Sequence, residues 1–258
     1  MSQGKVALVT AGAAGIGQVI ADTLLETGYA VHVCDVNEAA IHEFLTAYPT
    51  ASATIADVSK VDDVDRLFAD LQANHGGLDL LVNNAGIAGP TAAIEDIEPE
   101  AWEHTLAVDL NGIFYVTRKA TPLLKASSGV IVNMASNAGL FGCPLRSPYV
   151  AAKWAIIGLT KTWAMEMGPA GVRVNALCPG SVNGPRIDGV IERDALQRDM
   201  SAQAIRDVYQ RQNSMRTFVD PEEIADMVKF LASDAGRHIS GQAIAIDGHT
   251  EGLSNWLE

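Results

Sequence analysis

The sequence has 258 residues, of which 48% are hydrophobic and 19% charged, enough apolar material for one large core or two small ones. Its formal net charge of -13 would repel phosphate backbones and anionic lipid, so we expect neither a nucleic acid nor a membrane surface as a partner. We find no secretory signal and no run approaching the roughly 20 apolar residues of a membrane-spanning helix. We therefore expect a cytoplasmic protein with one domain over residues 1–258.

Short apolar runs alternate along the chain with longer segments of helical spacing. The runs are β-branched and continuously apolar, which is typical of strands buried on both faces of a parallel sheet. Strands are predicted at 5–10, 30–35, 51–57, 78–86, 129–136, 171–180 and 242–248, and helices at 16–28, 59–76, 99–127, 147–171 and 220–234. The alternation predicts an α/β fold with a doubly wound parallel sheet of about seven strands, flanked by helices.

The segment 181–219 interrupts the alternation between the sixth predicted strand and the last predicted helix. It is too polar for a core and too long for a plain connection. Such an excursion from the carboxyl end of a strand is a common location for a lid over a bound substrate. We therefore predict a substrate lid over residues 181–219.

A glycine-rich turn joins the first predicted strand to the first predicted helix, in the stretch KVALVTAGAAGIGQVIA. Gly12, Gly15 and Gly17 would let the backbone approach a pyrophosphate at the amino end of the helix, where free N–H groups and the helix dipole favour anions. Three glycines alone are a weak signal, because a tight turn that only packs a helix on a strand has the same pattern.

Asp35 helps to distinguish a nucleotide-binding turn from one that only packs a helix on a strand. It ends the second predicted strand, 18 residues after Gly17 (35 − 17). A carboxylate near this position accepts hydrogen bonds from the ribose diol of an adenine dinucleotide. It would also repel a 2′-phosphate, and the following Val36 and Asn37 supply no cation. This favours NAD over NADP. The alternative role of Asp35, as the N-cap of a helix, is compatible with ribose binding.

Seven separated motifs carry a resemblance that covers essentially the whole chain. They are TAGAAGIG, the pair Asp57–Val58, NNAG at 83–86, VDLNG around Asn111, VNMASNAG with Ser136, YVAAK with Tyr149 and Lys153, and CPG at 178–180. In order and spacing they resemble the classical short-chain dehydrogenase/reductase family. The resemblance implies a single-domain Rossmann-like fold that binds a nicotinamide dinucleotide and transfers hydride.

The family implies a role for each matching residue. Asn111, Ser136, Tyr149 and Lys153 match its catalytic tetrad, with 13 residues between serine and tyrosine (149 − 136). The implied cofactor-binding residues are Gly12, Ala14, Gly15, Ile16, Gly17, Asp35, Asp57, Val58, Asn84, Ala85, Gly86, Tyr149, Lys153, Pro179, Gly180 and Val182.

The chain departs from the family pattern at two positions. Ala11 stands where the family has the first glycine of the turn, so we expect a slightly altered turn. Gly184 stands where the family commonly has a threonine that contacts the nicotinamide carboxamide. Val182 or a lid residue would then supply that contact.

The tetrad residue types suit proton transfer during alcohol oxidation. A tyrosine with a pKa near 10 is a poor base unless its phenolate is stabilised, and a lowering by about three units needs roughly 4 kcal/mol. Lys153 lies four residues after Tyr149, on the same face of a helix, and its ammonium would favour the phenolate. Ser136 would donate to the substrate oxygen, and Asn111 would hold a water that links Lys153 to solvent. Each residue alone has a structural alternative, such as a serine cap or an asparagine in a kinked helix.

Arginines are frequent near the predicted site although the protein is acidic. Ion pairs between residues three or four apart explain most of those in the lid. We keep Arg146 and Arg186 as candidate contacts for an anionic or strongly polar substrate. The six histidines and three cysteines show no metal-ligand spacing, so we predict no metal site.

We expect an NAD-dependent oxidoreductase that transfers hydride between nicotinamide and a secondary alcohol or ketone. An NAD-selecting Asp35 favours oxidation, and the expected substrate is a small polyol, sugar or hydroxy acid. Reduction of a 3-oxoacyl thioester is an alternative, although no basic face is present to dock an acidic carrier. A non-catalytic nucleotide sensor is a third possibility that Ser136, Tyr149 and Lys153 disfavour.

Family members commonly form homotetramers, and the helices predicted at 99–127 and 147–171 have apolar faces able to associate. The carboxyl-terminal tail ends near Trp256, and we consider that residues 254–258 fold against a neighbouring subunit.

Overall fold

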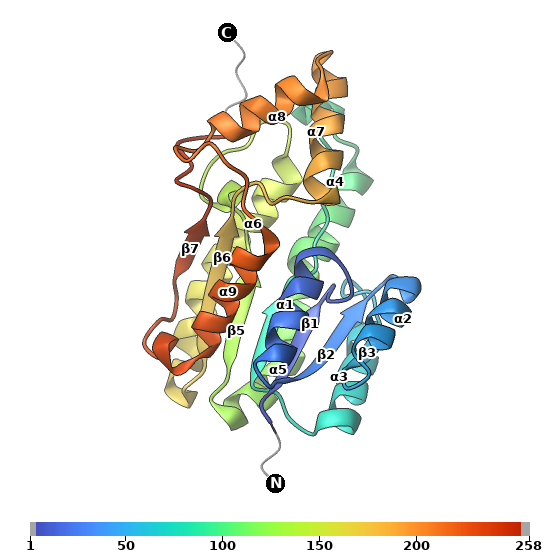
Figure 1. Ribbon diagram of the computed structural model, residues 1–258, viewed down its shortest axis with the longest axis vertical. Coiled ribbons are helices and arrows are strands. Elements are labelled where there is room, and N and C mark those ends of the chain that lie inside the picture. Colours follow the sequence, from blue (N-terminus) through green and yellow to red (C-terminus); the bar gives the residue numbers. More distant parts are fainter. Residues whose placement is uncertain (1–3, 254–258) are drawn as a thin grey trace.

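A parallel sheet forms the centre of the molecule (Figure 1). The computed structural model describes residues 4–253. Each strand pairs in parallel with its neighbours, in the order β3-β2-β1-β4-β5-β6-β7. The strands are β1 (Val6–Thr10), β2 (Ala30–Asp35), β3 (Ser52–Ile55), β4 (Leu80–Asn83), β5 (Val130–Met134), β6 (Arg173–Pro179) and β7 (Ala243–Ile246). The predicted seven-stranded doubly wound sheet is confirmed.

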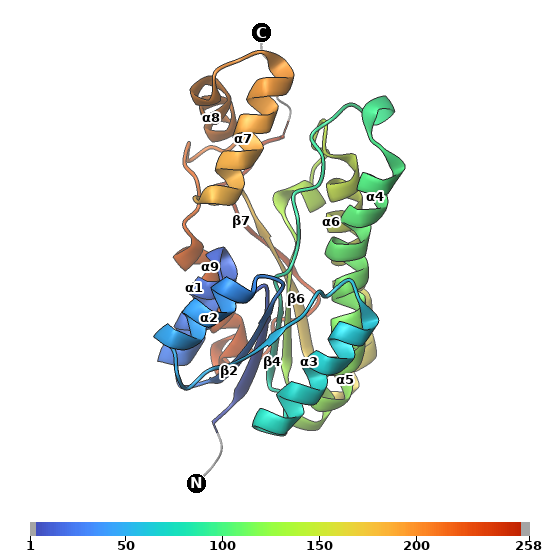
Figure 2. The same cartoon turned by 90° about the vertical axis from the view of Figure 1, so that its right-hand side faces the viewer.

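Helices cover both faces of the sheet, as the side view shows (Figure 2). One layer holds α1, α2 and α9, and the other holds α3, α5 and α6. The helices are α1 (Gly15–Glu26), α2 (Glu38–Ala47), α3 (Val61–His75), α4 (Pro99–Leu106), α5 (Gly112–Ser127), α6 (Ser147–Met167), α7 (Pro185–Arg198), α8 (Ala202–Arg211) and α9 (Pro221–Ala232). The sequence interpretation had not assigned α2. It also allowed Asp35 as the cap of a helix here, but the N-cap of α2 is Asn37, whose side chain accepts from the Ala40 N–H.

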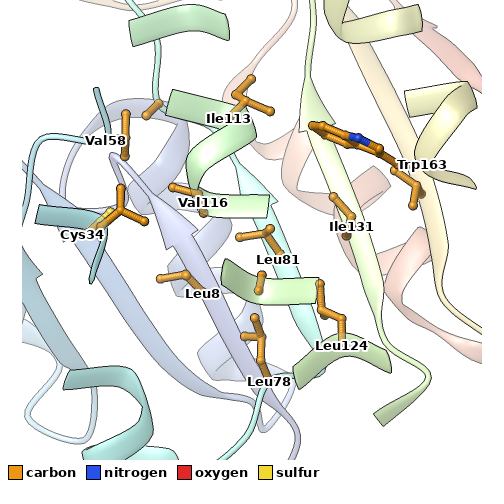
Figure 3. Close-up of a cluster of buried hydrophobic side chains, with 14 of the residues drawn as sticks. Leu8, Cys34, Val58, Leu78, Leu81, Ile113, Val116, Leu124, Ile131 and Trp163 are labelled. Carbon is orange, nitrogen blue, oxygen red and sulfur yellow. The ribbon is translucent and has the colours of Figure 1, made fainter. Parts of the chain in front are cut away.

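Each helical layer closes a separate apolar core against the sheet. Figure 3 shows part of one core, in which Leu81 and Ile131 from the strands meet Val116 and Trp163 from α5 and α6. The sheet is therefore buried on both faces, which explains its continuously apolar strands. At the carboxyl ends of β1 and β4 the strand order reverses. Open α/β sheets bind ligands in the crevice at such a switch point.

The segment predicted as one helix over 99–127 is divided by a π-helical turn, Ala107–Asn111, between α4 and α5. A π-turn inserts an extra residue into a helix and often marks a functional site. The predicted lid contains α7 and α8, which pack on each other through Ile191, Ala195 and Ile205. Both helices lie beyond the carboxyl ends of the strands (Figures 1 and 2). Between residues 4 and 253, no helix combines the length and the apolar character needed to cross a membrane.

Candidate active site

The glycine turn between β1 and α1 is closely packed on one side and open on the other. A Cβ on Gly12 would lie 2.7 Å from the Val9 carbonyl oxygen, and one on Gly17 would lie 2.0 Å from that of Ala11. Gly15 has a φ of +55°, and a Cβ there would have no described atom within 4 Å. Two glycines thus permit close packing, while the third exposes backbone to open space.

The amino end of α1 is left available to a ligand. Its N-cap residue, Ala14, makes no side-chain cap, and the first turn carries no acidic residue. In contrast, Asp220 and Glu223 form a complete capping box at the start of α9. The first N–H groups of a helix need acceptors, and the dipole favours an anion. An uncapped helix start behind an open glycine therefore fits the pyrophosphate of a dinucleotide, with Ile16 in its first turn.

Asn84 and Ala85 hold the glycine turn onto β4. The Asn84 amide donates to the carbonyl oxygens of Thr10 and Ala11, at 3.0 and 3.1 Å. The backbone N–H groups of Asn84 and Ala85 both donate to the Thr10 hydroxyl at 2.9 Å. Both residues therefore support the cofactor turn from behind. A Cβ on the next residue, Gly86, would lie 3.3 Å from Asp109 and 3.5 Å from the Lys153 ammonium, so glycine preserves space there.

The predicted adenosine contacts lie at the ends of β2 and β3. One Asp35 oxygen accepts from the Asn37 N–H at 3.0 Å, and within residues 4–253 no cation forms an ion pair with this carboxylate. Beside it, Val36 is 67% exposed and offers an apolar surface. Although burial opposes it, hydrogen bonds from Ser59 and the nearby Lys60 hold the pKa of Asp57 below its usual value. Val58 is buried against Gly112 of α5, so only its backbone can face a ligand.

Tyr149 and Lys153 lie on one face of α6, as predicted. The Lys153 Nζ is 5.3 Å from the centre of the Tyr149 ring and donates to the Met134 carbonyl oxygen at 2.9 Å. Burial alone would raise the pKa of Tyr149. The cations of Lys153, Arg186 and Arg146 together outweigh burial and the opposing carboxylate of Asp109, so the pKa lies below the usual 10. The tyrosine is thus prepared to give up its proton.

Ser136 follows β5 and is buried. Its hydroxyl accepts from the Ala138 N–H and donates to the Asn137 side chain, both at 3.2 Å. A Cβ on Gly139 would lie 2.7 Å from the Lys153 carbonyl oxygen, so the segment after Ser136 packs directly on the backbone of α6. This packing brings the serine segment to the helix that carries the tyrosine and lysine.

Asn111 is exposed and forms no side-chain hydrogen bond with another described residue, and its role of holding a water near Lys153 stays a prediction. The side chain of Asp109, which has no exposed surface, lies beside Lys153. One Asp109 oxygen accepts from the Ile87 N–H at 2.6 Å, and the other lies 3.8 Å from the Lys153 Nζ without a hydrogen-bond donor in the described part of the chain. The burial of Asp109 could have been predicted from the sequence. Asp109 is four residues before the buried Ile113 and therefore lies on the same face of the helix, whereas Asn111 does not.

The chain packs against neighbouring residues where it leaves β6, and the two ends of the lid segment pair with each other. Gly180 lies against Asp247, where a Cβ would approach within 2.9 Å, and continues the strand that ends at Pro179. Val182 pairs with Val219 in an isolated bridge that closes the lid segment on itself. Gly184 has a φ of +135°, which side-chain-bearing residues rarely adopt, so a threonine in this backbone conformation would be strained.

Arg146 and Arg186 both reach the loop that follows β4. The Arg146 Nη2 donates to the Ala88 carbonyl oxygen at 2.8 Å, and the Arg186 Nη1 donates to that of Gly86 at 3.1 Å. The Arg146 guanidinium carbon lies 4.8 Å from the centre of the Tyr149 ring. Among residues 4–253 we find no group of three or more His, Cys, Asp and Glu side chains able to hold a metal ion.

Comparison with known proteins agrees with this geometry. A family model described as enoyl-(acyl carrier protein) reductase matches residues 11–250. The D-beta-hydroxybutyrate dehydrogenase of Cupriavidus necator is 37% identical, over 96% of this chain and 98% of its own. The structure of NAD+-bound xylitol dehydrogenase has a TM-score of 0.90 at 28% identity, covering 95% of this chain and 99% of that one. Actinorhodin polyketide ketoreductase with NADPH has a TM-score of 0.90 at 32% identity, covering 99% of each chain.

The glycine turn, the Tyr149–Lys153 pair and these matches across almost the whole chain lead to the same assignment. The protein belongs to the classical short-chain dehydrogenase/reductase family and is an oxidoreductase of hydroxyl or keto groups.

Proposed function

We propose that the protein is an NAD-dependent dehydrogenase of a small, polar secondary alcohol, with Tyr149 as its acid/base. The observation that carries this proposal is the lowered pKa of Tyr149, which lies beside a buried ammonium in a site able to hold a dinucleotide. General acid–base catalysis is most effective when the pKa of the group lies near the working pH. A tyrosine brought below 10 can accept the hydroxyl proton of an alcohol.

In this mechanism the chain's own residues bind, orient and move a proton. The bound nicotinamide supplies the hydride acceptor for oxidation and the hydride donor for reduction. Ser136 orients the reacting oxygen through its hydroxyl, which can turn from Asn137 to the substrate. The Lys153 ammonium, 5.3 Å from the centre of the Tyr149 ring, stabilises the phenolate, which then takes the hydroxyl proton and becomes neutral.

Lys153 also lies near Asp109, which the sequence analysis did not single out. The free Asp109 oxygen lies 3.8 Å from the ammonium, slightly beyond a direct hydrogen bond. We propose that Asp109 positions Lys153 and moderates its charge, while the Met134 carbonyl fixes the ammonium on the other side.

Preference for NAD rests on Asp35. A carboxylate at the end of β2 accepts hydrogen bonds from a ribose diol and repels a 2′-phosphate, and no described cation compensates for it. The proposed direction, alcohol oxidation, follows from this preference. The test compares kcat/KM with NAD and NADP for the wild type, Asp35→Ala and the surface control Asp62→Ala. We expect a preference for NAD that Asp35→Ala alone reduces, by about tenfold or more.

Catalysis is tested separately by Tyr149→Phe, with turnover of secondary alcohols followed by NADH absorbance. Removing the acid/base should lower kcat by about 100-fold or more while binding of NAD is retained. Equal turnover in the wild type and Tyr149→Phe would sink the catalytic role. A wild-type preference for NADP would overturn the interpretation of Asp35.

Reduction of a 3-oxoacyl thioester is the second candidate, favoured by the similarity to a polyketide ketoreductase. The acidic character of the chain opposes docking of an acidic carrier protein. An acetoacetyl thioester of N-acetylcysteamine, offered with NADH or NADPH, distinguishes the two: faster turnover of this thioester than of any polar alcohol would favour the second candidate.

We also propose association of subunits through α5 and α6. Phe114, Trp154 and Met165 are large apolar side chains exposed on these two helices. Exposed apolar side chains that gather on one surface are typical of an interface between subunits. Light scattering after size exclusion measures the assembly, for which we expect a tetramer. The residues proposed for the tail contact, 254–258, lie outside the described part of the chain.

A further inference from the structure

Two arginines from distant parts of the sequence converge beside the catalytic tyrosine. Arg146 immediately precedes α6, and Arg186 lies in the first turn of α7. They donate to carbonyl oxygens only two residues apart, at Ala88 and Gly86. Both guanidinium groups favour the charged form of Tyr149, which places their charge within electrostatic reach of its ring. The loop after β4 thus carries two cations at the place where a substrate must lie.

Neither cation is neutralised by a carboxylate in the described part of the chain. Within residues 4–253, no carboxylate forms an ion pair with Arg146 or Arg186. Arg146 is only 8% exposed, and its buried Nε has no hydrogen-bond acceptor among those residues. A buried guanidinium without a counter-ion is costly, so such groups are normally paired. Two other lid arginines, which are only half-buried, do have carboxylate partners: Arg198 pairs with Asp194, and Arg206 pairs with Asp188.

We infer that Arg146 and Arg186 bind a carboxylate of the substrate, so that the substrate is a small hydroxy acid whose secondary hydroxyl lies at Tyr149. This inference rests on the proposed function and narrows its substrate class. The planar fork of a guanidinium matches the two oxygens of a carboxylate. Because Arg146 stacks 4.8 Å from the tyrosine ring, the carboxylate and the reacting hydroxyl must lie only a few bonds apart.

Arg186 would allow the lid to contact a bound carboxylate, because it lies in the first turn of α7. It is exposed and belongs to α7, whereas Arg146 is buried at the base of α6. A carboxylate held between them joins the lid to the fixed part of the site. Neutral polyols and sugars would leave the Arg146 guanidinium without a counter-ion, so they should be poor substrates.

The test uses racemic 3-hydroxybutyrate and its neutral amide as matched alcohols, with NAD at saturation. Arg146→Met and Arg186→Met remove the charges but keep much of the apolar stem, Arg146→Lys keeps a charge without the fork, and Arg193→Met is a control elsewhere on α7. We expect the wild type to favour the acid. Each methionine variant at 146 and 186 should lower kcat for both substrates, because it removes a cation that favours the Tyr149 phenolate. For the acid alone it should also raise KM, so that kcat/KM for the acid falls by about tenfold or more beyond the loss seen with the amide.

Calorimetric titration of the NAD-loaded enzyme with malonate, and with malonamide as the neutral control, measures the subsite without turnover. We expect malonate to bind more tightly than malonamide, and each methionine variant to abolish that difference. Arg146→Met could fail to fold because its side chain packs in the interior, but exposed Arg186→Met and charge-retaining Arg146→Lys keep the test decisive.

Failure of this inference is distinguishable from failure of the proposed function. Equal use of acid and amide by the wild type, or equal losses for both in the variants, would overturn the carboxylate subsite while alcohol oxidation stands. If no alcohol is oxidised, the proposed function fails, and the malonate titration alone decides the subsite. Equal affinities for malonate and malonamide would then overturn it.

Discussion

At the end of β1 the chain presents bare backbone to its ligand, whereas at the start of α6 it presents charged side chains. The first region is continuous in sequence, and its glycines, Gly12 and Gly17, are fixed by contacts shorter than a Cβ would tolerate. The second region is assembled from α6, α7, the π-turn and the loop after β4. It brings together three buried charged side chains, Lys153, Arg146 and Asp109. The cofactor side, at the glycine turn after β1, therefore depends on the shape of the backbone. The chemical side, around Tyr149, depends on buried charged side chains.

The largest effect should follow from adding a single methyl group to the backbone region. Gly17→Ala would place its Cβ 2.0 Å from the Ala11 carbonyl oxygen and 2.5 Å from the Asn84 amide, so the turn must shift. We expect about a 100-fold loss of NAD affinity, measured by fluorescence titration, and a lower midpoint of thermal unfolding. Gly77→Ala, where a Cβ meets no described atom within 4 Å, is the control. Unchanged NAD binding in Gly17→Ala would show that the turn is not the cofactor cradle.

A second prediction concerns His32, because the cofactor side buries a titratable group in its neutral form. Burial, reinforced by His75, lowers the pKa of His32 to about 4, and its ring contacts the hydroxyls of Ser52 and Thr54. The unfolded chain protonates this histidine below about pH 6.5, whereas the folded chain does so only near pH 4. The unfolding free energy should therefore fall as the pH falls from 6.5 to 4, by about 3 kcal/mol from this group.

Urea unfolding at pH 7, 5 and 4 measures this loss in the wild type, His32→Asn and the exposed control His42→Asn. The acid-dependent loss should be smaller in His32→Asn than in the other two proteins. Identical pH dependence in all three would contradict a neutral, buried His32.

A third, smaller effect tests the balance of charge on the chemical side. Asp109→Asn removes a negative charge that raises the pKa of Tyr149, while its side-chain oxygen can still accept from the Ile87 N–H. The pKa of Tyr149 should fall further, so the pH at which alcohol oxidation reaches half its maximum should move down by about one unit. The pH profile of kcat/KM measures this shift, and Asp65→Asn, in a surface pair with Lys119, should leave it in place. A shift to higher pH would refute the assigned role of Asp109.

The smallest effect lies again in the backbone region, at Ala11. Its φ of +48° is in the left-handed region, which costs a residue with a side chain about 1 kcal/mol. Ala11→Gly relieves this strain but gives the unfolded chain more freedom, so the net stabilisation should be below about 1 kcal/mol. Chemical denaturation measures it. A destabilisation of more than about 1 kcal/mol would mean that the Ala11 methyl group makes contacts that the turn needs.

Features formed by residues adjacent in the sequence could be predicted, whereas features assembled from distant segments could not. The seven strands were predicted because each is a short run rich in β-branched or other apolar residues, and the glycine turn was predicted because its residues are adjacent. Helix α2 was missed since it buries only Ile41 and Phe44, too narrow a stripe to stand out. Asp109 was missed because the family motif draws attention to Asn111, whereas the position of Asp109 beside Lys153 depends on how α6 packs against the π-turn. The burial of Arg146 could not be foreseen, because it depends on a contact with Ala88, 58 residues away.

The central claim is that the Lys153 ammonium lowers the pKa of Tyr149 for proton transfer. The most direct measurement is the pH profile of kcat/KM for alcohol oxidation, compared between the wild type and Lys153→Met. We expect a half-maximum below pH 10 in the wild type and a shift to higher pH, with much lower activity, in the variant. A profile that keeps its midpoint in Lys153→Met would contradict it.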